Sequence, residues 1–141
     1  MIYDRILSYC YQHCDLKACH YFCAMHPLLD ITGHPAGFIY QNTILHPISF
    51  NVFGVILGHC VFGLKGAVIG KFFDHHLYDK FGRIIAITGK RELSDQSASL
   101  DQSKTIQQAW QIIGKIEDHA APWVQPSPAW SDKTLHDFLG Q

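Results

Sequence analysis

The stretch ISFNVFGVILGHCVFGLKGAVIGKFF, from Ile48 to Phe73, combines apolar side chains with regularly placed glycines and decides the fold that we expect. Glycine inside a helix costs about 1 kcal/mol relative to alanine, so glycines within an apolar helix need a close backbone contact that compensates for them. Small residues four positions apart form such a contact face. We therefore predict a helical hairpin with its turn near residues 59–65, packed through the interaction residues Gly54, Gly58, Gly63, Gly66 and Gly70.

The surroundings of this stretch are poor in charge. From Ile31 to Leu64 the chain contains no Asp, Glu, Lys or Arg. Two environments fit such a segment: a lipid bilayer, and the interior of a water-soluble helical fold in which glycines allow tight crossings. Lys65 and Lys71 interrupt its second half and would have to lie at a membrane interface. The sequence favours neither environment over the other.

Two motifs within the stretch, FGVILG at 53–58 and GLKGAVIGKFFD at 63–74, resemble the glycine-zipper membrane anchor of DjlA-type DnaJ-like co-chaperones. The anchor of that family ends in a similar Gly, aromatic, Asp sequence. The resemblance implies a self-associating membrane segment. It does not extend to the His-Pro-Asp signature of the J-domain, because the His-Pro pairs of this chain are followed by Leu28, Ala36 and Ile48. Co-chaperone activity is therefore not implied.

The remaining sequence predicts two amphipathic helices. Apolar or small side chains recur at three- and four-residue steps over residues 2–25 and again over 104–119, as on a helix with one buried face. Two short apolar runs, 38–40 and 43–45, add at most one short β-hairpin. We thus predict a mainly α fold, a small helical bundle around the central glycine-rich hairpin at 48–73. No internal repeat is apparent.

A single domain is expected from the length of 141 residues. Its helical body spans residues 1–121, and a tail at 122–141 follows. The tail contains Pro122, Pro126 and Pro128 between Trp123 and Trp130. Proline keeps such a segment extended, whereas tryptophan prefers to be buried. We expect the tail to dock on the body.

Composition limits the partners and the compartment. A net charge of -1, and the lack of any basic cluster, argue against nucleic acid as a partner. The amino terminus has no secretory signal, and the five cysteines are an odd number, with four of them between Cys10 and Cys23. Such cysteines indicate reduced thiols rather than a disulfide framework. We expect an intracellular protein, membrane-associated or cytoplasmic.

One group of titratable residues could bind a metal. His75, His76 and Asp79 follow the apolar stretch, and on a helix His75 and Asp79 would share a face, as two zinc ligands do. Two ligands do not complete a site, and a polar helix end explains the group more simply. No nucleophile elbow and no phosphate-binding loop is present. We therefore assign no catalytic residue and expect neither a cofactor nor an enzyme.

These observations predict a small helical interaction protein that binds a protein partner or a second copy of itself, in one version at a membrane through the glycine zipper. Two alternatives stay open. The first is a soluble adaptor or immunity-like binding protein, and the second is a metal-dependent enzyme that uses the His75, His76 and Asp79 cluster.

Overall fold

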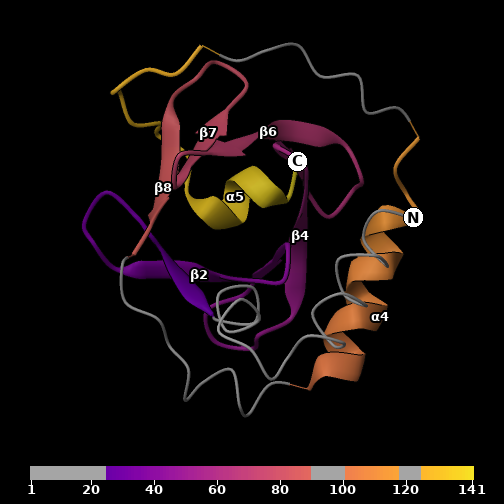
Figure 1. Ribbon diagram of the computed structural model, residues 1–141. Coiled ribbons are helices and arrows are strands. Elements are labelled where there is room, and N and C mark those ends of the chain that lie inside the picture. The colour runs from indigo at the N-terminus through magenta and orange to yellow at the C-terminus, as the bar shows by residue number, and fades with distance from the viewer. Residues whose placement is uncertain (1–24, 90–100, 118–124) are drawn as a thin grey trace.

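The computed structural model describes residues 25–89, 101–117 and 125–141. Within these ranges the chain forms a closed β-barrel with two helices (Figure 1). Each strand pairs antiparallel with the next, and the last strand pairs with the first. The strands are β1 (His26–Leu29), β2 (Pro35–Tyr40), β3 (Thr43–Leu45), β4 (Val52–Leu57), β5 (Cys60–Phe62), β6 (Val68–Phe73), β7 (His76–Asp79) and β8 (Ile84–Thr88). The helices are α4 (Gln102–Ile113) and α5 (Leu135–Leu139).

The prediction of a mainly α fold is wrong, and so is the helical hairpin at 48–73. That stretch contains the strands β4, β5 and β6. Its apolar runs consist largely of Val, Ile and Phe, which favour strands. A spacing of four residues also fits one face of a strand, because alternate side chains of a strand share a face. Glycine spacing therefore could not distinguish the two structures.

The prediction that this stretch is a helical membrane segment is not supported either. No helix in the described ranges is long and apolar enough to cross a membrane. The glycine-zipper anchor required such a helix, so the resemblance to the DjlA-type anchor does not reflect the structure. The amphipathic helix predicted for residues 2–25 lies outside the described residues, apart from Met25.

The barrel is built from four equivalent units, contrary to the expectation that the chain has no repeat. In each unit, one branched apolar residue pairs across two strands with a glycine or alanine. These pairs recur at steps of 16 or 17 residues along the chain: Leu28 with Gly37, Ile44 with Gly54, Val61 with Gly70, and Leu77 with Ala86. Side chains in the repeat vary, but the paired small residue is kept in all four units.

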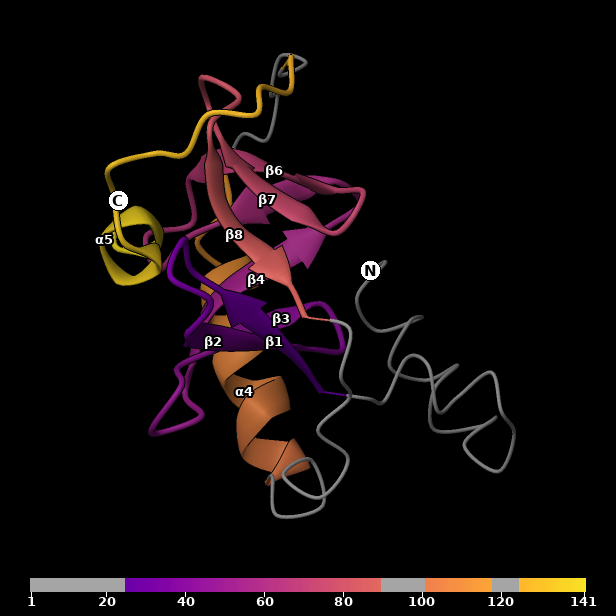
Figure 2. The same ribbon diagram turned by 90° about the vertical axis from the view of Figure 1, so that its left-hand side faces the viewer.

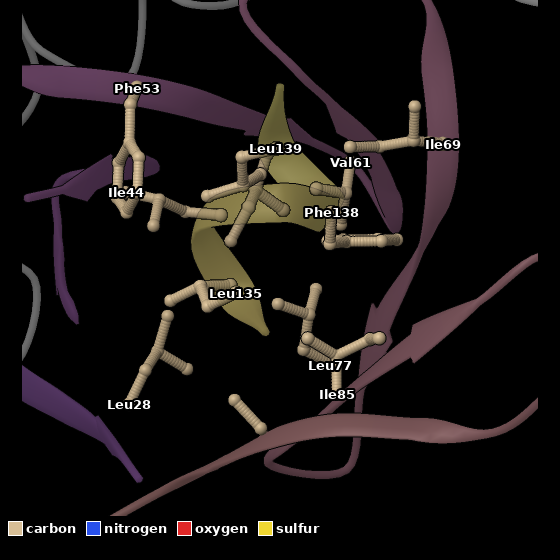
Figure 3. Close-up of a cluster of buried hydrophobic side chains, with 12 residues drawn as sticks. Leu28, Ile44, Phe53, Val61, Ile69, Leu77, Ile85, Leu135, Phe138 and Leu139 are labelled. Carbon is tan, nitrogen blue, oxygen red and sulfur yellow. The ribbon is translucent and has the colours of Figure 1, made fainter. Parts of the chain in front are cut away.

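Helix α5 occupies the interior of the barrel at one end (Figures 1 and 2). Its side chains Leu135, Phe138 and Leu139 are buried among residues of the inner wall, including Leu28 and Leu77 (Figure 3). The small residues of the repeat make room for it. A Cβ atom on Gly37 would lie 2.9 Å from Leu135 Cδ2, and one on Gly54 would lie 2.8 Å from Leu139 Cδ2. Glycine on the inner wall thus lets a helix enter a narrow barrel.

Helix α4 packs on the outside of the barrel, against strand β4 and its neighbours (Figure 2). Asp101 caps its first turn by accepting a hydrogen bond from Lys104 N at 3.2 Å. Gln108 ties the helix to the start of β4: its Oε1 accepts from Val52 N at 2.9 Å, and its Nε2 donates to Asn51 Oδ1 at 3.0 Å. The observed helix ends at Ile113, six residues before the predicted end of the 104–119 helix.

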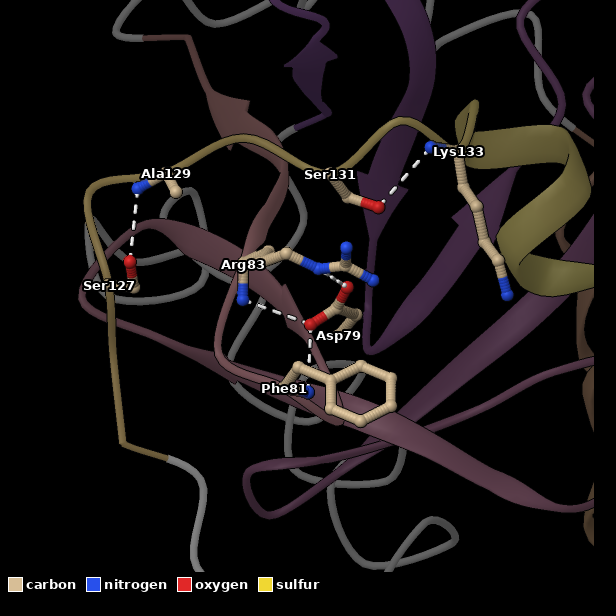
Figure 4. Close-up of polar contacts among 7 residues, drawn as sticks. All are labelled: Asp79, Phe81, Arg83, Ser127, Ala129, Ser131 and Lys133. Atoms are coloured by element: carbon tan, nitrogen blue, oxygen red, sulfur yellow. Dashed lines mark hydrogen bonds and ion pairs between the residues drawn. The ribbon is translucent and has the colours of Figure 1, made fainter.

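The carboxyl-terminal segment reaches the barrel interior along strand β8 (Figure 4). Ile84 N donates to Ala129 O at 2.8 Å, and Ser131 N donates to Ile84 O at 2.8 Å. Thr134 then caps α5 by accepting a hydrogen bond from Asp137 N. Residues 125–141 therefore belong to the same packed unit as the barrel.

Candidate interaction surface

Four turns lie together at the end of the barrel that holds α5. They join β1 to β2, β3 to β4, β5 to β6 and β7 to β8, and in an antiparallel barrel these connections all lie at one end. We call them the turn ring, defined by residues 30–34, 46–51, 63–67 and 79–83. Each turn is closed by a backbone hydrogen bond of 2.8–3.2 Å from its first residue, namely Asp30, His46, Gly63 or Asp79, to the carbonyl of its last.

The four turns share one left-handed residue just before their last position. It is glycine in three turns, with φ of +84° at Gly33, +78° at Gly66 and +81° at Gly82, and Phe50 in the fourth, with φ of +58°. Glycine adopts this conformation without steric strain, whereas phenylalanine does so rarely. All four turns thus have a residue with positive φ at this position, although phenylalanine rarely adopts such a φ value.

Three of the four turns are also held by the side chain of their first residue. Asp30 Oδ1 accepts from Thr32 N at 2.9 Å and from His34 N at 3.0 Å. Asp79 Oδ1 accepts from Phe81 N and Arg83 N, both at 2.9 Å (Figure 4). Carboxylates that accept backbone N–H groups in this way fix the conformation of a turn.

His46 takes the place of the aspartate in the second turn. Its Nδ1 accepts from Ile48 N at 3.2 Å and from Ser49 N at 3.3 Å. The His46 ring thus supplies the acceptor that a carboxylate supplies in the first and fourth turns. The turns are therefore rigid through several independent hydrogen bonds.

Each rigid turn exposes one large apolar side chain. The exposed fractions are 67% for Ile31, 85% for Ile48, 39% for Leu64 and 78% for Phe81. Among the described residues these four are the exposed large hydrophobic side chains, and all lie one or two positions after the first residue of their turn. Four apolar side chains, one in each turn of the same ring, form a pattern, whereas single exposed apolar residues on a protein surface are ordinary.

Helix α5 lies within the turn ring. Leu64 N donates to Leu139 O at 2.9 Å, which joins the third turn to the helix. The ring of His136, on the exposed side of α5, lies 6.3 Å from the ring of His46 in the second turn. The helix and the turns thus form one continuous face.

Electrostatic interactions on this face stay local. Arg83 Nε forms an ion pair with Asp79 Oδ2 at 2.9 Å, and the Arg83 guanidinium carbon lies 5.2 Å from the centre of the Phe81 ring. The hydrogen bond from the Thr32 side chain lowers the pKa of Asp30, and backbone hydrogen bonds of the turn add to this effect. Both aspartates serve to hold their turns in shape.

The glycines predicted as helix-packing residues are distributed over different parts of the barrel. Gly54 and Gly70 lie on the inner wall in β4 and β6, and Gly58 lies in the two-residue turn between β4 and β5. Gly63 and Gly66 belong to the turn ring. The structure therefore does not bring the five together on one face.

The residues considered for a metal site are separated in the same way. His75 lies in the turn before β7 and His76 begins that strand, whereas Asp79 ends it beside the turn ring. An extended strand rises about 3.3 Å per residue, so His75 and Asp79 cannot share a ligand shell. The carboxylate of Asp79 already accepts hydrogen bonds from the backbone of its own turn. In the described part of the chain, no three His, Cys, Asp or Glu residues are grouped so that they could hold a metal ion.

The residues missed by sequence reasoning are the four exposed side chains of the turn ring. A signal for them is visible in the chain. Asp30, His46, Gly63 and Asp79 recur at steps of 16 or 17 residues, and the two-residue turns Gln41-Asn42, Gly58-His59 and Asp74-His75 recur between them. A search for turn residues at a fixed period, rather than for glycine spacing alone, would have found the repeat.

Comparison with known proteins agrees with the fourfold architecture. No curated protein and no solved structure matches the chain. The model of one family, described as 4-fold beta flower protein, matches residues 15–139. This finding replaces the resemblance to a co-chaperone anchor, and the four hairpin units around α5 fit the description. The chain belongs to the 4-fold beta flower protein family.

Proposed function

We propose that the protein is a β-barrel interaction module that associates with a second copy of itself through the turn ring. One observation carries the proposal: the exposed large apolar side chains of the described residues all lie in the turn ring, one in each of the four turns. Exposed apolar residues gathered on one face are typical of association surfaces.

Rigidity of the turn ring supports this function. Association loses free energy when loops must become ordered on binding. Backbone N–H groups that donate to the side chains of Asp30, His46 and Asp79 already hold three of the turns in shape. The third turn is held through the bond between Leu64 N and Leu139 O. The apolar tips are thus presented at little further conformational cost.

Charge on this face favours a second copy as the partner. The turn ring and residues 131–141 contain as many basic as acidic side chains: Lys65, Lys80, Arg83 and Lys133 against Asp30, Asp79, Asp132 and Asp137. Two identical faces without net charge can meet without electrostatic repulsion. A twofold axis perpendicular to the barrel axis would place four apolar tips against the same four of the other copy.

Sedimentation velocity over a wide range of protein concentration tests the proposal. We expect a monomer–dimer equilibrium for the full chain, and a loss of dimer in Ile48→Glu, because this change places a charge at the most exposed apolar tip. Gln107→Glu, on the exposed side of α4, adds the same charge away from the turn ring and should leave the equilibrium unchanged.

Two results would contradict the proposal. The first is a wild-type chain that stays monomeric at the highest concentration. The second is an equal loss of dimer in Ile48→Glu and Gln107→Glu, since this would show a general effect of charge rather than a specific face.

A further inference from the structure

The pair of Cys60 and Lys71 lies on the outer wall of the barrel, away from the turn ring. Cys60 begins β5, and Lys71 is its cross-strand partner in β6. Their neighbours Val61 and Gly70 face the barrel interior, so alternation along the strands directs both side chains outward. Lys71 Nζ donates a hydrogen bond to Cys60 Sγ at 3.2 Å.

The lysine of this pair is unusually buried. Only 8% of Lys71 is exposed, and within the described residues the sulfur of Cys60 is the one hydrogen-bonding partner of its ammonium group. No carboxylate of those residues forms an ion pair with it. A buried ammonium group is unfavourable unless a partner compensates its charge, and the sulfur of Cys60 is the partner that lies at hydrogen-bonding distance from Nζ.

Tyr78 is the other acidic group beside Lys71, as its cross-strand partner in β7. Burial raises the pKa of Tyr78, and the charge of Asp74 raises it further, so the phenol stays neutral. Within the described part of the chain, the acidic group at hydrogen-bonding distance from Nζ is the thiol of Cys60. Ammonium next to sulfur favours the thiolate, which is the nucleophilic form of cysteine.

We propose that Cys60 is a peroxide-reactive thiol whose thiolate is stabilised by the buried ammonium group of Lys71. The site goes beyond the proposed self-association and lies at the far end of β5 from the turn ring. Cys60 is half-buried rather than enclosed, so a small oxidant can reach its sulfur.

The reaction is a two-electron oxidation by hydrogen peroxide. Sγ attacks one peroxide oxygen and forms an S–O bond while the O–O bond breaks. The sulfur becomes a sulfenic acid. The departing hydroxide takes up a proton from the solvent and becomes water. The peroxide is thus reduced by the two electrons that the sulfur loses.

Trapping of the sulfenic acid tests the site. The folded full chain is treated with hydrogen peroxide in the presence of dimedone, and the labelled cysteine is identified by peptide mass spectrometry. Site-resolved detection is required because Cys10, Cys14, Cys19 and Cys23 also react with such reagents when accessible. We expect label on Cys60.

Variants of the lysine separate an activated thiol from an accessible one. Lys71→Met keeps the length and the apolar stem of the side chain but removes its charge, and it should slow labelling of Cys60 several-fold. Lys71→Arg keeps the charge and should retain most of the rate. Lys104→Met, at an exposed lysine in the first turn of α4, should leave the rate unchanged.

Alkylation of Cys60 by iodoacetamide gives a second readout that needs no oxidant, and it should follow the same order among the variants. An unlabelled Cys60 in the folded wild type would overturn the proposal. So would a wild-type labelling rate in a folded Lys71→Met protein, or loss of labelling in a folded Lys71→Arg protein. Cys60→Ser should leave the sedimentation of the protein unchanged, which separates this test from that of self-association.

Discussion

Glycines on the inner wall decide how much room the barrel has. Gly70 is the tightest of them, because a Cβ atom there would overlap the carbonyl oxygen of Tyr78 and approach Phe138 Cζ to 2.9 Å. The same position in the fourth unit is Ala86, which is completely buried. The inner wall therefore accommodates the methyl group of Ala86 in the fourth unit but has no room for one at Gly70, because α5 does not lie equally close to the four units.

Replacement of Gly70 by alanine should lower the free energy of unfolding by about 1–3 kcal/mol, the usual penalty for overpacking a core. Urea unfolding followed by circular dichroism measures this effect. Gly140→Ala is the matched control, because the nearest atoms to its added Cβ lie at ordinary distances of 3.5 and 3.8 Å. Equal destabilisation by the two substitutions would argue against a steric limit at Gly70.

Asp30 makes stability depend on pH. The hydrogen bond from the Thr32 side chain lowers the pKa of Asp30 below the ordinary value of 3.8. Its carboxylate therefore stabilises the folded state above pH 3.8, and this contribution disappears as the pH falls through the lower native pKa. The effect is small, because the group lies near the surface and is screened by water.

Asp30→Asn should be less stable than the wild type at neutral pH, and the difference should shrink when unfolding is measured below the ordinary pKa of aspartate. Asp132→Asn, an exposed carboxylate in the segment that leads to α5, serves as control and should show little difference at either pH. A gap between Asp30→Asn and wild type that stays constant with pH would show that charge is not involved.

At the scale of elements, α5 depends on the barrel and the barrel depends on α5. Helix α5 has five residues, far fewer than an isolated helix needs in water. Its stability comes from the burial of Leu135, Phe138 and Leu139, whose exposed fractions are 2%, 1% and 0%. Without these side chains the inner wall would face an empty interior lined by Leu28 and Leu77.

Phe138→Ala should therefore lower the free energy of unfolding by about 3–5 kcal/mol, as for other buried aromatic residues. Thermal and urea unfolding measure the change. Asp137→Ala, at the exposed neighbouring position, keeps the backbone hydrogen bond to Thr134 and should have a small effect. A loss below 1 kcal/mol in Phe138→Ala would mean that the helix does not support the barrel.

At the scale of the whole molecule, the four exposed apolar tips of the turn ring, Ile31, Ile48, Leu64 and Phe81, are separate from the buried core. These tips lie outside both buried clusters, so their replacement should not disturb packing. At protein concentrations where the wild type is monomeric, Ile48→Glu and Phe81→Glu should therefore unfold within about 0.5 kcal/mol of the wild type, as is usual for surface changes, while both lose the dimer at higher concentration. Parallel unfolding and sedimentation experiments check this. Destabilisation that accompanies the loss of dimer would instead assign the tips a structural role.

Prediction from the sequence succeeded where local chemistry alone decides the structure. The amphipathic run that contains Ile106, Ala109 and Ile113 indicated a helix, and α4 forms over that run. It failed over 48–73, where the spacing of Gly54, Gly58 and Gly70 fits a helix as well as a strand. Local pattern cannot separate these structures when both bury the same side chains.

The sequence by itself determined that apolar side chains within 48–73 are buried, as Val55 and Val61 are. It did not determine the reversals at Gly58 and Gly66, whose left-handed backbone replaces the helix packing predicted for them. Only the tertiary structure decided that the strands close into a ring, that α5 enters it, and that the turns gather their apolar tips at one end. The reason is physical: pairing of β1 with β8 and contact of α5 with the inner wall join residues far apart in the chain. Such contacts depend on the register of every strand between them.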